Sequence, residues 1–270
     1  MKVLVTNDDG VASPGLHALV QGVIDAGYEV TVVAPSTDMS GAGASIGMLH
    51  IDQHIDADRV DLPGLDGVPA FAVAGPPGLC VLAARLGGFG ESPDVVVSGI
   101  NPGCNTGRAV LHSGTVGAAL TAANFGLRGL AVSIDVAGPV SDRDVGEPSR
   151  HWRSAATVAA AALPWLVEAP ATTVVNINVP DRSLGEIRGA RWGNLASFGT
   201  VRSAVVEAPV EGGRLQMEFR PTNEALPPDT DTALVMAGHV AITTITGVQA
   251  TEPVDVGPIV GSALAAIGSG

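Results

Sequence analysis

The first 35 residues read MKVLVTNDDGVASPGLHALVQGVIDAGYEVTVVAP. The apolar run at residues 3–6 predicts a buried strand, residues 14–26 predict a helix with proline in its tolerated first turn, and residues 29–34 predict a second strand. A strand, a crossover helix and a second strand form a βαβ unit, in which the two strands are parallel. The stretch therefore predicts an α/β protein with a mostly parallel sheet.

The same alternation continues through the first two thirds of the chain. Further strands are predicted at residues 68–74, 94–98, 130–134 and 173–179, and helices at 79–86, 113–125 and up to about 167. The fold class is thus α/β, a doubly wound three-layer sandwich built by residues 1–180. Residues 35–47 and 137–150 are expected to be loops.

The alternation of predicted strands and helices ends after residue 180. Residues 181–250 are predicted to form an extension or arm used in assembly, with a short helix at 232–238 and a strand at 239–246. Residues 251–270 are expected to be a weakly helical tail.

Composition limits the function classes. The 270 residues are 46% hydrophobic and 15% charged, which excludes overall disorder. A net charge of −13 makes a nucleic-acid polymer an unfavourable partner. No run of about 20 apolar residues or secretory signal is found, so a cytoplasmic protein without a membrane partner is expected. Cys80 and Cys104 are too few for a disulfide framework and are expected to be small core or loop residues.

Asn7, Asp8, Asp9 and Gly10 follow the first predicted strand. In an open α/β sheet the carboxyl ends of the strands face the ligand crevice, so two adjacent acids lie where chemistry is usually done. A turn that caps the next helix is the alternative, but one acid is enough for a cap. A second acid adds repulsion that a bound cation would relieve.

The loop SGAGASIG, residues 40–47, lets backbone N–H groups approach a ligand closely, and Gly41 and Ser45 are its candidate substrate contacts. Its glycine spacing differs from the G-x-G-x-x-G dinucleotide fingerprint, and it follows the second strand instead of the first. A nicotinamide-dependent reductase is therefore a remote alternative, and a merely flexible loop is another.

Residues 95–120, VVVSGINPGCNTGRAVLHSGTVGAAL, have the anatomy of an anion site. Ser113, Gly114 and Thr115 stand where a helix should begin, and free backbone N–H groups with the positive end of the helix dipole stabilise phosphate there. Ordinary capping by Ser113 is the competing explanation. Capping does not explain Asn101 and Asn105 in the preceding glycine-rich loop, and these residues favour phosphate binding.

Oxygen donors from three successive loops are expected to meet at one crevice, and they belong to Asp8, Asp9, Ser40 and Asn101. Such donors favour Mg²⁺ or Mn²⁺, or Ca²⁺ in a crystal, over zinc. A metal beside the phosphate-binding helix end can polarise a phosphoryl oxygen and activate water. The sequence thus predicts a hydrolase of a phosphorylated small molecule, with Asp8, Asp9 and Asn101 as its catalytic residues.

The strings TNDDG, VVAP followed by SGAGASI, PDVVVSGINPGCN and HSGTVGAAL, in this order, resemble the SurE family of metal-dependent nucleotidases and phosphatases. The likeness extends more loosely through NINVP and TDTALVMAGHVAIT. It implies a 5′-nucleotidase with a Rossmann-like core and a C-terminal extension exchanged between subunits of a homodimer or homotetramer. It also implies a divalent ion on Asp8, Asp9, Ser40 and Asn101, phosphate contacts from Ser113, Gly114 and Thr115, and well-kept motifs around Asn7 and Asn105.

Three differences from the family pattern are predicted to lie near the substrate. They are Ala44 in place of histidine, GPPGLC at residues 75–80 in place of GTPADC, which puts Pro76 and Leu79 at changed positions, and Pro102 in place of arginine. Polar groups that could read the substrate are lost, while the metal and phosphate residues are kept. A repurposed phosphatase and a SurE-like binding protein without turnover are therefore open alternatives to an ordinary nucleotidase.

Two basic side chains precede the predicted anion site. His112 could donate a proton to the leaving group or have a structural role, and Arg108 could attract a larger anion or be a solvated surface residue. Four other histidines lack metal-like spacing and are expected in surface or packing positions, namely His50, His54, His151 and His239.

Overall fold

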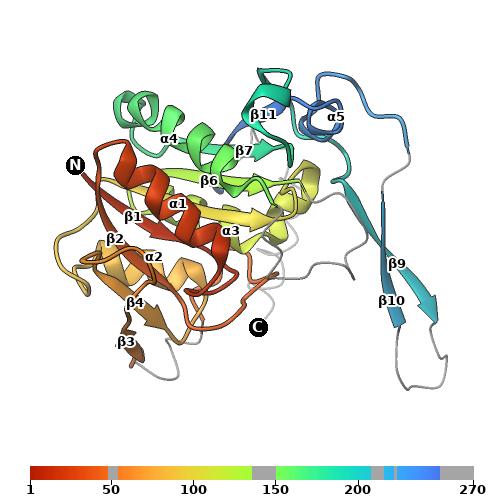
Figure 1. Ribbon diagram of the computed structural model, residues 1–270. Helices are drawn as coiled ribbons and strands as arrows, with labels where there is room; N and C mark the ends of the chain where they lie inside the picture. The colour runs from red at the N-terminus through yellow and green to blue at the C-terminus, as the bar shows by residue number, and fades with distance from the viewer. Residues whose placement is uncertain (48–53, 136–149, 208–215, 222–223, 250–270) are drawn as a thin grey trace, which may run out of the picture.

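The computed structural model describes residues 1–47, 54–135, 150–207, 216–221 and 224–249. These residues form a nine-stranded sheet with helices on both faces and a separate two-stranded ribbon (Figure 1). The strands are β1 (Lys2–Thr6), β2 (Glu29–Pro35), β3 (Ala57–Arg59), β4 (Ala70–Val73), β5 (Val95–Pro102), β6 (Arg128–Ile134), β7 (Val174–Val179), β8 (Ala190–Trp192), β9 (Val201–Glu207), β10 (Gln216–Pro221) and β11 (Val240–Ile245). The helices are α1 (Pro14–Asp25), α2 (Pro77–Arg85), α3 (Gly114–Asn124), α4 (Trp152–Glu168) and α5 (Asp231–Met236), with 3₁₀ turns η1 (Gly107–His112) and η3 (Leu184–Glu186).

The strand order of the large sheet is β3-β4-β2-β1-β5-β6-β7-β11-β8. Its six central strands, β4 to β7 in this order, are parallel to one another, whereas β3 and β11 run antiparallel to their neighbours β4 and β7. After β1 the chain forms β2 on one side of β1, and it later forms β5 on the other side of β1. The order therefore reverses between β1 and β5, and at such a switch point the connecting loops diverge and leave room for a ligand.

Two helix layers cover the sheet. Helices α1 and α4 pack together on one face, where Val3, Val5 and Leu163 belong to a single apolar cluster. Helices α2 and α3 cover the other face, where Leu4 packs with Val81. Successive strand residues point to opposite faces, which explains why Leu4 lies in a different cluster from its two neighbours. The predicted three-layer α/β sandwich is confirmed.

The predicted strands and helices of the first 180 residues that lie within the described ranges are confirmed to within a few residues. Strand β5 continues to Pro102, beyond the predicted end at residue 98, and the short elements β3, η1 and β8 are not predicted. The expected loop at 137–150 lies almost wholly outside the described residues, and so does the expected tail at 251–270.

The segment predicted as an extension has two structural parts. Strand β11 pairs antiparallel with β7, and β8 pairs with β11, so this part of the chain continues the main sheet beyond residue 180. Among the described strands, β9 and β10 pair only with each other, and they project away from the sheet (Figure 1). We call this two-stranded ribbon the arm.

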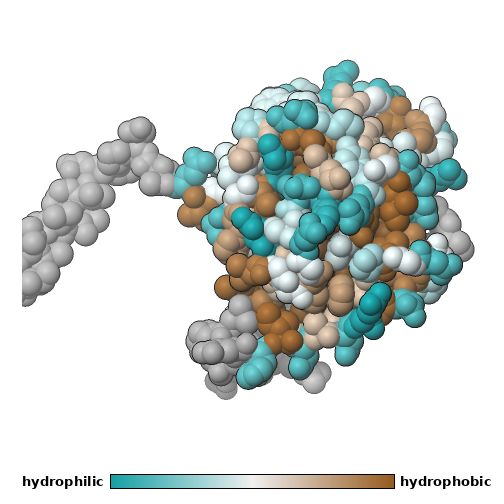
Figure 2. Space-filling view, turned by 90° about the vertical axis from the view of Figure 1, so that its left-hand side faces the viewer, coloured by the Kyte–Doolittle hydropathy of each residue, from teal (hydrophilic) through white to brown (hydrophobic). Residues whose placement is uncertain are grey.

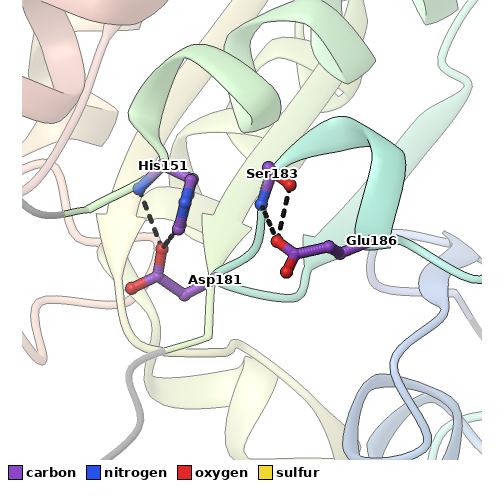
Figure 3. Close-up of polar contacts among 4 residues, drawn as sticks. All are labelled: His151, Asp181, Ser183 and Glu186. Carbon is purple, nitrogen blue, oxygen red and sulfur yellow. Dashed lines mark hydrogen bonds and ion pairs between the residues drawn. The ribbon is translucent and has the colours of Figure 1, made fainter.

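A polar junction fastens the start of α4 to the segment after β7. Asp181 Oδ1 accepts a hydrogen bond from the backbone N–H of His151 at 2.8 Å and lies 2.9 Å from its Nδ1 atom (Figure 3). Ser183 and Glu186 close a capping box around η3 (Figure 3). His151 thus has a structural role at the surface, which agrees with the expectation of a surface or packing position.

The surface carries its large apolar side chains on several different elements. The most exposed include Leu86 after α2, Leu111 in η1, Trp165 in α4 and Trp192 in β8. On the face drawn in Figure 2, apolar residues are interspersed with hydrophilic ones. Within the described residues, no helix has the length and apolarity that a bilayer span requires.

Candidate functional site

The predicted acids and the predicted asparagine lie at the switch point of the sheet. Asp8 and Asp9 follow β1, and Asn101 lies near the end of β5. Strands β1 and β5 are hydrogen-bonded neighbours, with Thr6 paired to Ser98. The structure therefore brings these side chains to adjacent strand ends, where open α/β sheets bind ligands.

Asp8 is a buried carboxylate at the beginning of α3. Its side chain is 3% exposed, and Thr115 Oγ1 donates a hydrogen bond of 2.5 Å to its Oδ1 atom. A Cβ atom on Gly114 would lie 2.7 Å from Asp8 Oδ2, so only glycine lets the helix approach this closely. Burial raises the pKa of Asp8, although the Thr115 hydroxyl and the N–H groups of Thr115 and Gly114 oppose that rise.

The loop after β2 is tied to the loop after β1 through its backbone. The N–H of Met39 donates to the carbonyl of Asp8 at 2.7 Å, and the N–H of Val11 donates to the carbonyl of Pro35 at 2.8 Å. Ser40 follows directly and is exposed, with its N–H bound to Asp38 Oδ1. Three of the four predicted metal ligands therefore lie on two loops that are hydrogen-bonded together.

The glycine-rich loop at residues 40–47 rests on two helical glycines. A Cβ atom on Gly117 of α3 would lie 2.1 Å from the carbonyl oxygen of Gly43, and a Cβ atom on Gly78 of α2 would lie 2.5 Å from that of Ser45. Contacts of this length are not tolerated between a side-chain carbon and backbone oxygen. The two glycines thus set how deeply the loop sits above α2 and α3.

The beginning of α3 is compatible with both interpretations of its sequence, namely helix capping by Ser113 and phosphate binding. Ser113 is the N-cap, and its Oγ atom accepts a hydrogen bond from the N–H of Val116 at 3.1 Å. The N–H groups of Gly114 and Thr115 act on the Asp8 carboxylate, which shows that this helix end already stabilises an anionic group. Capping by Ser113 is confirmed, and phosphate binding stays a prediction.

Asn105 anchors the loop that precedes η1 through four hydrogen bonds to the sheet. Its backbone N–H donates to Asn178 Oδ1 at 2.8 Å, and its carbonyl accepts from Asn176 Nδ2 and Asn178 Nδ2. Its own side-chain amide donates to Ser133 Oγ at 2.9 Å. These bonds come from β6 and β7, so Asn105 holds the loop to the sheet.

The remaining predicted residues have varied surroundings. Asn7 is fully buried, and its Nδ2 atom donates to the carbonyl of Gly10 and to Ser13 Oγ, which shapes the turn after β1. Gly41 and Ser45 are exposed on the glycine-rich loop, and Asn101 Nδ2 donates to the carbonyl of Gly103 at 2.6 Å. Arg108 and His112 are both exposed on η1.

One expectation about the substrate side is wrong. Leu79 is only 5% exposed and belongs to the apolar cluster between α2 and the sheet, so it is a core residue. Pro76 is the buried N-cap position of α2. Ala44 is exposed and Pro102 is half-buried, so these two differences lie where a ligand could reach them. The GPPGLC motif therefore changes helix packing more than it changes the polar lining of the site.

Five residues that pack against the site loops or form hydrogen bonds to them are not among the site residues predicted from the sequence. They are Gly78, Gly117, Asn176, Asn178 and Asp231. Asn176 and Asn178 could have been found from the alternation in NINV, because asparagines two apart in a strand face the same side. The helical glycines and Asp231 give no local signal, since their partners are distant in sequence.

The donor set fits a hard divalent cation. Within the described residues there is no group of three or more His, Cys, Asp or Glu side chains that could hold a metal ion, so a zinc-type site is not favoured there. Asp8 is buried and forms no ion pair with any Lys, Arg or His of the described residues. Carboxylate, hydroxyl and amide oxygens at one strand edge suit Mg²⁺ or Mn²⁺.

Comparisons with known proteins agree with this geometry. The family model described as "Survival protein SurE" matches residues 3–201. A protein from Methanopyrus kandleri named 5′-nucleotidase SurE is 42% identical over 70% of this chain and 70% of its own length. A protein of the same name from Legionella pneumophila is 37% identical over 90% of each chain. The crystal structure of the SurE protein from Aquifex aeolicus superposes with a TM-score of 0.71 at 25% identity, covering 91% of this chain and 93% of that one. With its fold, its strand-end acids and these similarities taken together, the chain belongs to the SurE family.

Proposed function

We propose that this protein is a divalent-metal-dependent phosphomonoesterase that hydrolyses nucleoside 5′-monophosphates. The observation that carries the proposal is the buried carboxylate of Asp8, which lies between the N-terminus of α3 and the loop of Ser40. A buried carboxylate without a cationic side chain is costly, and a bound cation removes that cost. The name 5′-nucleotidase SurE, carried by the relatives from M. kandleri and L. pneumophila, supports the substrate class.

In this proposal Asp8, Asp9, Ser40 and Asn101 hold the cation, which is Mg²⁺ or Mn²⁺. When bound, such an ion supplies a Lewis acid that polarises a phosphoryl oxygen and favours attack by water. Thr115 orients the Asp8 carboxylate through its hydroxyl group. Asp8, Asp9 and Asn101 are thus the proposed catalytic residues.

The protein's own charge makes local compensation necessary for an anionic substrate. The net charge is −13, so a phosphate monoester needs positive potential at the site itself. The beginning of α3, at Ser113, Gly114 and Thr115, supplies it through the positive end of the helix dipole. Asn7 and Asn105 keep the neighbouring loops in place, and Gly41 and Ser45, which are exposed on the glycine-rich loop, are proposed to contact the substrate.

The test is hydrolysis by protein stripped of metal and then supplied with Mn²⁺ or Mg²⁺. The substrates are the four common nucleoside 5′-monophosphates, a nucleoside 3′-monophosphate, a sugar phosphate and p-nitrophenyl phosphate. We expect metal to raise the rate at least about 100-fold, because cation stabilisation of a phosphoryl transition state is worth several kcal/mol. Equal rates with chelator and with metal would contradict the proposal. A phosphatase that prefers sugar phosphates would contradict only its nucleotide part.

We also propose that the arm exchanges between subunits of a homodimer or homotetramer. An isolated two-stranded ribbon is marginally stable in water, and β9 and β10 pair with no other described strand. Light scattering on the purified chain tests this, and a monomer at micromolar concentration would exclude it.

A cytoplasmic location is proposed as well, because both described cysteines are free thiols, as expected in a reducing compartment.

A further inference from the structure

Asp231 is a fully buried acid that lies far from the proposed metal ligands in sequence. It begins α5, and its side chain is 0% exposed. Oδ2 accepts a hydrogen bond of 2.8 Å from the backbone N–H of Gly107. Oδ1 accepts from the N–H of Ala196 at 2.9 Å and from that of Thr232 at 2.8 Å. One carboxylate therefore joins three separate chain segments.

The first of these segments leads directly into the proposed phosphate site. Gly107 begins η1, which ends at His112, and Ser113 then caps α3. The backbone of η1 also lies close to the glycine-rich loop, because a Cβ atom on Gly43 would be 3.2 Å from the carbonyl oxygen of Leu111. A shift of Gly107 would thus move the chain that carries Ser113.

The second segment is the root of the arm. Ala196 and Phe198 come shortly before β9, and a Cβ atom on Gly107 would lie 2.5 Å from the carbonyl oxygen of Phe198. Thr232 Oγ1 donates to the same carbonyl at 2.8 Å. Gly107 also has a φ of +59°, which L side chains rarely adopt. Gly107 is therefore fixed between the arm root and Asp231.

We propose that Asp231 is a positioning residue for phosphate binding, which holds Gly107 so that η1 presents the beginning of α3 to the phosphate group. This inference rests on the proposed function. Asp231 acts through the backbone and touches no reacting atom. Three of the four proposed metal ligands, Asp8, Asp9 and Ser40, lie on other loops, and the fourth, Asn101, belongs to strand β5. The Asp231 carboxylate is therefore expected to affect phosphate binding more than metal binding.

Asp231→Asn is the sharpest variant. The Oδ1 atom accepts two N–H groups and Oδ2 accepts one, so the amide is expected to keep its oxygen at the position with two donors. Its NH₂ group then faces the N–H of Gly107, and only the bond to the phosphate side is lost. Asp229→Asn is the matched control, because Asp229 lies two residues away, is exposed and accepts a hydrogen bond from Asn194.

The measurements are kcat and KM for p-nitrophenyl phosphate, the inhibition constant of inorganic phosphate, and the Mn²⁺ concentration at half-maximal activity. For Asp231→Asn we expect the inhibition constant and KM to rise about 10-fold and kcat/KM to fall about 100-fold, as for a displacement of about 1 Å. The Mn²⁺ requirement should change less than about twofold, and Asp229→Asn should match the unmodified protein.

Two results would overturn the proposal. One is an Asp231→Asn protein that is less stable but keeps KM and the phosphate inhibition constant, since a purely structural role predicts that outcome. The other is an equal change in the Mn²⁺ and phosphate constants.

A separate measurement covers the case in which Asp231→Asn does not fold. Hydrogen exchange of the unmodified protein should show the Gly107 amide protected as strongly as core strand amides, and rapid exchange would refute the proposal. If the unmodified protein hydrolyses no phosphomonoester, the proposed function fails. Exchange at Gly107, and phosphate binding followed by thermal shift in the presence of Mn²⁺, would still decide the role of Asp231.

Discussion

The two sides of the site are held in different ways. The proposed metal side consists of the loops after β1 and β2, which are joined by backbone bonds such as that from Met39 to Asp8, together with Asn101 in β5. The proposed phosphate side, from Asn105 to Ser113, is held by side chains of β7 and α5. Local turns are thus sufficient to bring the acids together, whereas the phosphate loop depends on partners that lie at least 71 residues further along the chain. Substitutions on the two sides should therefore fail in different ways.

The largest effect is expected on the metal side, at Asp8. Asp8→Asn keeps the shape and the bond from Thr115 but removes the charge that a cation needs. We expect kcat to fall at least about 1,000-fold, which corresponds to about 4 kcal/mol of transition-state stabilisation. The metal-free variant should be at least as stable as the unmodified protein in urea, because it no longer buries a carboxylate. The exposed Asp58→Asn is the control, and turnover within tenfold of normal in Asp8→Asn would exclude Asp8 from the site.

The next largest effect is expected at Gly117, one of the two helical glycines against which the glycine-rich loop packs. Gly117→Ala places a carbon 2.1 Å from the carbonyl oxygen of Gly43, and backbone must move on one side or the other. Because Ser40 lies on the same loop, kcat/KM should fall about 100-fold, with a raised Mn²⁺ requirement. Gly185→Ala is the control, since it has open space for a Cβ atom. An unchanged Mn²⁺ requirement in Gly117→Ala would show that the loop does not carry a metal ligand.

A smaller effect is expected from the asparagines behind the phosphate loop. Asn178→Ala removes two hydrogen bonds to the backbone of Asn105, whereas Asn176→Ala removes one. Leaving a buried N–H without a partner costs about 1–3 kcal/mol, so Asn178→Ala should be the less stable variant in urea. Its phosphate inhibition constant should rise about 10-fold while the Mn²⁺ requirement stays constant. Equal losses in the two variants would contradict the assigned network.

The smallest effect is a stability change at high pH that leaves the site unaltered. Burial raises the pKa of the Cys80 thiol to about 12, from 9.0 in the unfolded chain. The folded state thus keeps a proton that the unfolded state releases, and this contribution to stability declines as the pH rises from about 9 towards 12. Cys80→Ala should lack the decline, which amounts to about 1 kcal/mol by pH 10. Urea midpoints of both proteins at pH 8 and pH 10 measure it, and parallel pH profiles would contradict it.

Most of the fold could be predicted from the sequence, because apolar strands and alanine-rich helices alternate along the first 180 residues. The edge strands β3 and β8 could not, since each has three residues and all of them are exposed. The return of β11 to the sheet was also missed. Its pairing with β7 depends on a contact between distant segments, which local patterns do not encode.

The closeness of the proposed metal ligands could be predicted for a related reason. Asp8 and Asp9 are adjacent in the sequence, and the parallel sheet brings Asn101 to the neighbouring strand end. The supports of the phosphate side lie 73 residues apart for Asn105 and Asn178 and 124 residues apart for Gly107 and Asp231. The expectation that Leu79 lies near the substrate is wrong because its side chain fills the core, and a changed motif alone does not reveal which way a side chain points.

The packing of the glycine-rich loop against two helical glycines has a consequence for which residues of this loop can vary among related enzymes. The carbonyl groups of Gly43 and Ser45 fit against Gly117 and Gly78, while the side chains of Ala44 and Ile46 face solvent. The main-chain path is thus locked in place, but its outward-pointing groups are free to be exchanged. If the loop contacts the substrate as proposed, replacing Ala44 or Ile46 would alter that contact without an insertion, a deletion or a new path of the polypeptide.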